Sequence, residues 1–250
     1  MKTTLYSIEG KALRQIDLPE LFEGQYRDDL IKRAVLSDES REYQPKGSFK
    51  FAGLQTSAKY RGRKEMYAAI KNKGIPHLPH EVQPKGQFGK VKRVPHAVKG
   101  RRAHPPKPET KLIEEVNKKE YKKALKSALA ATADKSVVSA RYKKLTLASY
   151  PLVLENSFES LSKTKDVLKV LSSLNLNSMI DNSKSNGCKG ALVVATGSIL
   201  KAARNIAGVD SVSPAQLKVK HLAPGCAGGR VTIYSENALQ ELKKLFSTSS

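Results

Sequence analysis

The sequence predicts an α/β protein in which a mostly parallel sheet is covered by helices and a long basic extended loop is inserted near the N-terminus. Three observations lead to this expectation. Short apolar runs alternate with helical patterns after residue 109, as they do in parallel sheets with crossover helices. Positive charge is concentrated between residues 45 and 108. Pro and Gly are frequent in the same stretch, where they prevent long helices and strands from forming.

The spacing of apolar residues locates the individual elements. Before the basic stretch it predicts a strand over Thr3–Ser7 and a helix over Arg27–Ser40. The helices expected after it are Thr110–Ala131, Lys135–Lys144, Lys163–Leu174, 198–206 and 235–246. The strands expected there are Pro151–Leu154, Ala191–Ala195, Val209–Val212 and Arg230–Tyr234. Ser198 and Ser235 stand where a hydroxyl can cap the helix that follows.

The charge distribution divides the chain. Residues 45–108 hold 16 Lys or Arg and 2 acids, a net +14, whereas the other 186 residues hold 29 basic and 21 acidic side chains, a net +8. We therefore expect one globular α/β domain formed by residues 1–44 together with 109–250, and an extended basic loop over 45–108. The single regular element expected in the loop is a short helix near Lys64–Lys71. The total excess of +22 predicts a polyanionic partner, nucleic acid in preference to a membrane surface.

The side chains of the basic stretch suit RNA. Lys and Arg can contact phosphates, and aromatic rings can stack on unpaired bases. The aromatic residues interleaved with the cations are Phe49, Phe51, Tyr60, Tyr67 and Phe88. The histidines expected to serve as small polar or stacking groups against RNA are His77, His80, His96 and His104. A flexible, solvated charge run is the alternative, but a plain linker needs no interleaved aromatic residues.

Motifs for other kinds of chemistry are missing from the sequence. It contains no phosphate-binding or dinucleotide-binding glycine motif and no nucleophile elbow. Residues 224–229 are glycine-rich but precede a predicted strand, so we expect a tight turn there. Cys188, His221 and Cys226 lack the paired spacing of a zinc site. We therefore expect no enzyme activity, metal or cofactor; the alternative is an α/β enzyme with a basic substrate loop.

Localisation follows from two further observations. No apolar run reaches the 18 or more residues that a membrane span needs, so we expect no membrane partner. The chain has two cysteines, which fits a reducing cytoplasm.

Several motifs together resemble one family. They are VPH at 94–96, KGRRAHPPK at 99–107, ARNIAGV at 203–209, HLAPG at 221–225, LP at 18–19, RDDLI at 27–31 and KTK at 163–165. The sequence is similar over nearly its whole length to the large-subunit ribosomal protein L-four family, and the HPPK tetrapeptide is typical of its archaeal and eukaryotic branch. The long basic C-terminal extension of the eukaryotic members is missing, which favours the archaeal type.

The resemblance implies a structural component of the large ribosomal subunit, in the cytoplasm, that binds large-subunit rRNA beside neighbouring ribosomal proteins. It implies that the loop penetrates the rRNA and that its tip, near Arg61–Pro79, helps line the polypeptide exit tunnel along the nascent peptide. It also implies RNA contacts by Arg61, Arg63, Lys64, Lys90, Arg93, Lys99, Arg101, Arg102 and His104. Lys92, His96 and Lys107 of the same basic stretch complete the expected rRNA-binding set.

One region departs from the family pattern, and one alternative function stays open. Ser183–Gly190 is shorter and less basic than the corresponding stretch of family members, which puts RNA contact there in doubt. A regulatory RNA-binding protein that acts on mRNA would need the same cationic surfaces, so the sequence does not exclude that function.

Overall fold

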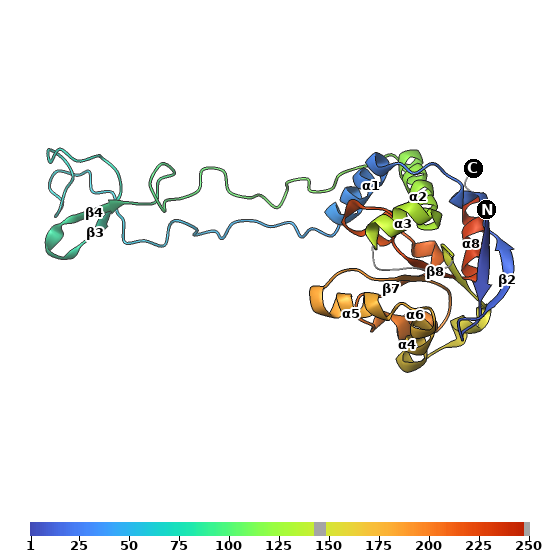
Figure 1. Cartoon of the computed structure of the whole chain (residues 1–250). Helices are drawn as coiled ribbons and strands as arrows, with labels where there is room; N and C mark the ends of the chain where they lie inside the picture. The colour runs from blue at the N-terminus through green and yellow to red at the C-terminus, as the bar shows by residue number, and fades with distance from the viewer. Residues whose placement is uncertain (143–148, 248–250) are drawn as a thin grey trace. The chain divides into compact units, whose positions relative to one another are not determined.

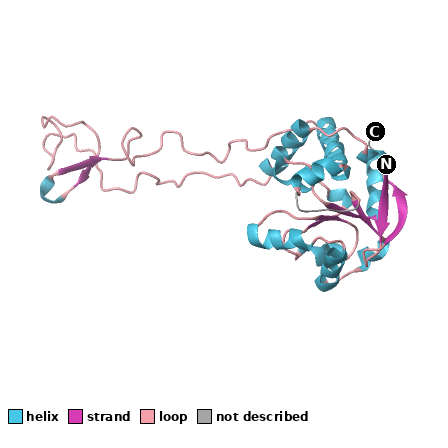
Figure 2. Cartoon of the chain, in the orientation of Figure 1, coloured by secondary structure: helices cyan, strands magenta, loops and turns pink. Residues whose placement is uncertain are grey.

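The structure is a computed structural model that describes residues 1–142 and 149–247. The chain folds as two compact units. The first, here the globular unit, combines Met1–Glu42 with Ile113–Ser250, and the second, here the basic unit, is Tyr43–Leu112. Most helices and all six strands of the main sheet belong to the globular unit, whereas loops make up most of the basic unit (Figure 2).

The globular unit is built on a six-stranded sheet of order β2-β1-β5-β8-β6-β7. The strands are β1 (Lys2–Tyr6), β2 (Ala12–Asp17), β5 (Leu152–Leu154), β6 (Leu192–Val194), β7 (Asp210–Val212) and β8 (Thr232–Ser235). β2 pairs with β1 in the antiparallel sense, and every other pairing in this sheet is parallel. The predicted mostly parallel sheet is thus confirmed, with one antiparallel edge strand that the sequence pattern did not reveal.

Helices cover both faces of this sheet (Figure 1). The helices are α1 (Asp28–Ser40), α2 (Lys118–Ala133), α3 (Lys135–Arg141), α4 (Thr164–Ser173), α5 (Asn177–Asn186), α6 (Ile199–Arg204), α7 (Val219–Leu222) and α8 (Glu236–Ser247). One hydrophobic cluster lies between the sheet and helices α1, α2, α7 and α8. A second cluster lies between the opposite face and helices α4, α5 and α6.

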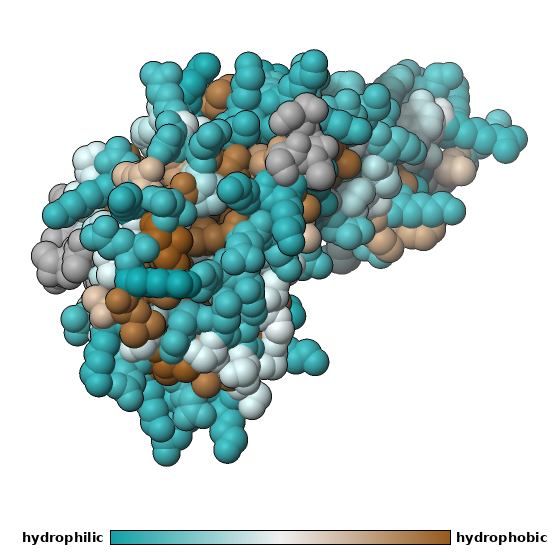
Figure 3. All heavy atoms as spheres, turned by 90° about the vertical axis from the view of Figure 1, so that its right-hand side faces the viewer, coloured by the Kyte–Doolittle hydropathy of each residue, from teal (hydrophilic) through white to brown (hydrophobic). Residues whose placement is uncertain are grey.

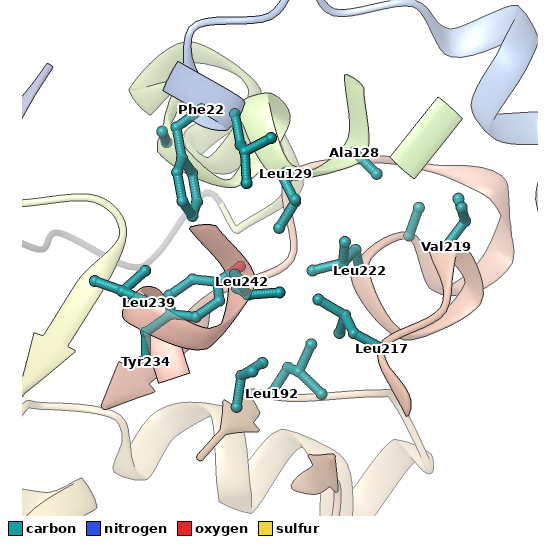
Figure 4. Close-up of a cluster of buried hydrophobic side chains, with 14 of the residues drawn as sticks. Phe22, Ala128, Leu129, Leu192, Leu217, Val219, Leu222, Tyr234, Leu239 and Leu242 are labelled. Atoms are coloured by element: carbon teal, nitrogen blue, oxygen red, sulfur yellow. The ribbon is translucent and has the colours of Figure 1, made fainter. Parts of the chain in front are cut away.

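The strands supply both clusters because successive side chains point to opposite faces. In β8, Tyr234 belongs to the first cluster and Ile233 to the second. Figure 4 shows Tyr234 among the leucines of α8, with Phe22 nearby, and the two rings meet edge to face at 5.6 Å. Since both faces are buried, β5 (LVL) and β6 (LVV) are continuous apolar runs, as predicted, whereas β8 (TIYS) also carries buried hydroxyl groups. Hydrophilic residues cover most of the face drawn in Figure 3, with hydrophobic residues showing between them.

The basic unit contains a small antiparallel sheet. Its strands are β3 (His80–Val82) and β4 (Phe88–Val91), and Lys59 forms an isolated bridge to His80. The two chain segments that flank this sheet approach each other inside the unit. A Cβ atom at Gly53, whose φ is +73°, would lie 2.7 Å from the Cα of Arg101, so glycine suits this position on both counts.

Two predicted helices differ from the structure. The helix expected over Thr110–Ala131 begins only at Lys118. Its expected first two turns are irregular and contact α1 instead, where Ser37 Oγ donates to the carbonyl of Glu114 and the Glu114 amide donates to Ser40 Oγ. The short helix near Lys64–Lys71 is wrong. Turns occupy this stretch, and Ala68 has a φ of 54°, which is incompatible with a helix.

The two predicted helix caps have opposite outcomes. Ser235 Oγ accepts a hydrogen bond from the amide of Ala238 at 3.2 Å, so its capping of α8 is confirmed. Ser198 precedes α6, but its hydroxyl donates to the carbonyls of Glu159 and Leu161 and does not cap the helix. The expected second helix, Lys135–Lys144, is present as α3 up to Arg141, and its last two residues lie outside the described residues.

Candidate nucleic-acid interface

All twelve residues expected to bind rRNA belong to the basic unit. Arg61 and Lys92 are half-buried, and the other ten are exposed. Arg61 lies beside the small sheet, where it lines a shallow recess with Lys59, His80 and Phe88. Arg63 and Lys64 follow Arg61 closely in the chain, and the other nine lie on β4 or in the segment that follows it. The structure therefore gathers a few of these cations around the small sheet and spreads the rest along an irregular chain.

The cations of the basic unit have no acidic partners among the described residues. The unit holds 17 Lys or Arg and 3 acids, and none of its cations joins an ion pair with a described acid. In the globular unit, by contrast, cations such as Arg14, Arg33 and Lys189 each lie within 3 Å of a carboxylate oxygen. Unneutralised cations held in one segment repel one another and favour a polyanionic partner.

Four of the five aromatic side chains that were expected to stack on RNA remain open to solvent. Phe49, Phe51, Tyr60 and Tyr67 are 61%, 52%, 56% and 75% exposed. Exposed rings of this size, set among cations, are suited to stacking on unpaired bases. Phe88 differs, because the Lys73 ammonium lies over its ring at 5.1 Å and the side chain is only partly exposed.

His80 does not fit its expected role. We predicted that it would serve as a small polar or stacking group against RNA, but its side chain is buried. Its two ring nitrogens lie 2.9 Å from the carbonyl oxygen of Gly89 and 3.0 Å from that of Pro76, and its ring meets Phe88 edge to face. The imidazole thus holds the small sheet together. The sequence could not distinguish His80 from its neighbours, because both of its partners depend on the fold of the unit.

The residues around the small sheet form a compact element, which sequence analysis did not predict. Ala58 and Ile70 are buried, and the Ile70 amide donates to the carbonyl of Arg61 at 2.9 Å. Arg93 Nη1 donates to the carbonyl of Ala58 at 3.2 Å. Two expected RNA-contacting arginines therefore also help to shape the unit. A chain segment with its own fixed contacts presents its cations in a defined arrangement.

In Ser183–Gly190, the stretch that departs from the family pattern, both lysines form ion pairs with acidic side chains. Lys184 lies 3.8 Å from a carboxylate oxygen of Asp181, and Lys189 lies 2.9 Å from one of Asp210. Both acids compete with phosphate for these ammonium groups. The pairing gives a structural reason to leave this stretch out of the interface.

Other kinds of site find no support in the described part of the chain. No cluster of three or more His, Cys, Asp or Glu among residues 1–142 and 149–247 is placed to hold a metal ion. None of the described helices combines the length and hydrophobicity of a membrane span.

An α/β unit joined to a segment of unpaired cations and exposed rings defines the class of nucleic-acid-binding proteins. Comparison with known proteins narrows this class. The model of the ribosomal protein L4/L1 family matches residues 16–245. The large ribosomal subunit protein uL4 of Methanocaldococcus jannaschii is 41% identical over 98% of this chain and 100% of the relative. The proteins of the same name from Methanococcus maripaludis and Methanoculleus marisnigri are 40% and 38% identical, each over 98% of this chain.

The chain belongs to the ribosomal protein L4/L1 family. The resemblance noted in the sequence is confirmed, as is its archaeal type, since the three relatives are archaeal.

Proposed function

We propose that this protein is a structural component of the large ribosomal subunit that binds large-subunit rRNA through the basic unit. The observation that carries the proposal is the set of cations in Tyr43–Leu112 without an ion pair to any described acid. Phosphate contacts would neutralise them and release condensed counterions, which favours binding. The family is ribosomal and structural, so the protein works in the cytoplasm, in the ribosome, and is not an enzyme.

The basic unit acts in this proposal as an extended loop over residues 45–108 that enters folded rRNA. Its exposed rings stack on unpaired bases, and its cations follow the backbone. The segment Arg61–Pro79 is the tip that helps line the polypeptide exit tunnel beside the nascent peptide. Two features support this role for the tip. Met66 and Tyr67 are strongly exposed there, and buried Ile70 gives the segment a fixed shape. Neighbouring large-subunit proteins contact the globular unit.

A titration of the full chain tests RNA choice. The probes are a large-subunit rRNA fragment, the leader transcript of the protein's own mRNA, and an unrelated RNA of equal length, all at one salt concentration. We expect the rRNA fragment to bind at least about a thousandfold more tightly than the unrelated RNA, the lower end of the usual gap between specific and non-specific binding. The leader transcript should bind like the unrelated RNA. Tighter binding to the leader than to rRNA would favour the regulatory function on mRNA instead.

A further inference from the structure

Helix α2 carries a stripe of lysines that belongs to the globular unit and lies outside the basic unit. Lys118, Lys119, Lys122, Lys123 and Lys126 are all exposed. At 100° per residue they fall within 140° of the helix circumference, on one side of α2. We infer that this stripe is a second RNA-contacting surface, and that it binds the phosphate backbone of duplex RNA. The inference rests on the proposed function, because it concerns the same RNA partner.

The orientation of α2 is fixed by its opposite side. Ala124, Ala128 and Leu129 are buried in the core between α2 and the sheet. Tyr121 Oη donates to Asp38 Oδ2 at 2.8 Å and accepts a hydrogen bond from the Val219 amide at 3.2 Å. These contacts join α2 to α1 and α7, so the helix cannot rotate about its axis. The lysine stripe is therefore held toward solvent by the packing of the fold.

The stripe concentrates the charge of the globular unit. Residues 118–126 hold five Lys and one acid, a net +4. The whole globular unit holds 28 basic and 20 acidic side chains, a net +8, so half of its excess lies in nine residues. The single acid, Glu120, is paired with Arg33 of α1 at 2.9 Å. Its charge is therefore already engaged away from the stripe.

The positions of these lysines lower the stability of α2. Like charges four residues apart, as at Lys118, Lys122 and Lys126, destabilise a helix. Lys118 and Lys119 occupy the first turn, where the positive end of the helix dipole disfavours cations. Asn117 precedes the helix without a side-chain capping bond. A local arrangement that opposes stability in three ways indicates a functional demand, and a polyanion placed along the stripe would relieve the first two.

The composition of the stripe selects duplex backbone over unpaired bases. Its five cations are lysines, which act as point charges, and it lacks the arginine forks that recognise planar groups. The one aromatic residue in this stretch, Tyr121, is engaged with Asp38 and Val219, away from the stripe. The stripe extends over about 12 Å of helix axis at 1.5 Å per residue, enough to follow a run of phosphates. The basic unit, with its exposed rings, is suited to unpaired bases instead.

The test uses the full chain and a fully paired RNA duplex as the probe. The variant carries Lys→Gln substitutions at Lys118, Lys119, Lys122, Lys123 and Lys126, and affinity is measured over a range of salt concentrations. Each lost phosphate contact reduces the salt slope by about 0.7–0.9, so losing all five reduces it by about 3.5–4.5. We also expect the free variant to unfold at a temperature no lower than that of the wild type, because repulsion within α2 is removed.

A charge-matched control separates the stripe from general surface charge. It replaces five exposed lysines elsewhere on the globular unit with Gln, and we expect it to keep nearly the wild-type salt slope. The control positions are Lys165, Lys169, Lys184, Lys201 and Lys243. An equal drop in both variants, or an unchanged slope in the α2 variant, would overturn the inference. The proposed function fails separately, if the wild type does not prefer large-subunit rRNA to unrelated RNA.

Discussion

Deleting residues 45–108 and joining Gln44 to Glu109 by a short Gly-Ser linker is expected to remove most of the affinity for large-subunit rRNA. The deleted segment holds 16 of the 45 basic side chains and only 2 of the 23 acids. A protein that makes six to ten phosphate contacts loses about 10³–10⁵ in affinity between 50 and 200 mM salt. We therefore expect a loss on the order of a thousandfold or more at physiological salt, together with a much shallower salt dependence.

The same deletion should leave the globular unit folded. Both hydrophobic clusters of the main sheet consist of residues outside 45–108. The two ends of the deleted segment are held close to each other, because Ser37 and Ser40 of α1 both bond to the backbone of Glu114. Circular dichroism and a cooperative thermal transition check this expectation. An unfolded deletion variant, or one that binds rRNA as tightly as the full chain, would contradict the division of roles between the two units.

Replacing Arg230 with Ala is expected to cost about 3–5 kcal/mol in the free energy of unfolding, as the loss of one partner of a buried ion pair usually does. The Arg230 side chain is fully buried and lies 2.8 Å from Asp210 Oδ2. It also donates to the carbonyls of Gly190, Ala191 and His221 at 2.7, 3.2 and 2.8 Å. These bonds join the segments that begin β6 and β7 to the end of α7. Alanine would leave the carbonyls without this donor and the Asp210 carboxylate with Lys189 as its remaining cation.

Denaturant unfolding of matched variants checks the Arg230 prediction. Arg230→Lys keeps the charge but not the planar fork, so its stability should lie between wild type and Arg230→Ala. Arg14→Ala removes the exposed partner of Glu236 and should change stability little. Nearly equal stabilities for Arg230→Ala and Arg14→Ala would show that the buried pair does not hold the sheet edges together.

The dependence of stability on pH provides a second test of the ion pair between Arg230 and Asp210. Burial raises the pKa of the Asp210 carboxyl, but Lys189 and Arg230 lower it more, so it lies below its ordinary value. A carboxyl with a lowered pKa in the folded state adds stability above its unfolded pKa and loses it as the pH falls through the folded value. Asp210→Asn should therefore reduce the loss of stability between neutral and acidic pH, even though it lowers stability at neutral pH.

The sequence predicted best those elements whose burial follows a simple pattern. The apolar runs around Val153 and Val193 became central strands because both faces of the sheet are covered. β2 was not predicted, because five of its six residues are exposed and its sequence shows no alternation of buried and exposed positions. α5 was not predicted either, since it is rich in Asn and Ser, which are weak helix formers. Its packing, through Met179 and Ile180, depends on the finished core.

The candidate interface was predictable in composition but not in geometry. The sequence located the charge excess and the exposed rings, because both follow from residue type and spacing. It could not identify the strands β3 and β4, which are three and four residues long and adjoin Pro and Gly. Nor could it show that His80 is buried or that Ser198 bonds to Glu159, since those partners are set by tertiary contacts. The lysine stripe of α2 became distinct only when its opposite face was seen to be anchored.

Sedimentation of the native protein from a cell lysate through a sucrose gradient in high salt tests the central claim most directly. A structural component held by many rRNA contacts should migrate with the large ribosomal subunit at about one copy per subunit, because buried contacts are screened far less than exposed ones. Release of the protein to the top of the gradient, while the subunits themselves stay intact, would contradict the account. It would mean that the charge gives only peripheral attachment, and the regulatory function on mRNA would then be preferred.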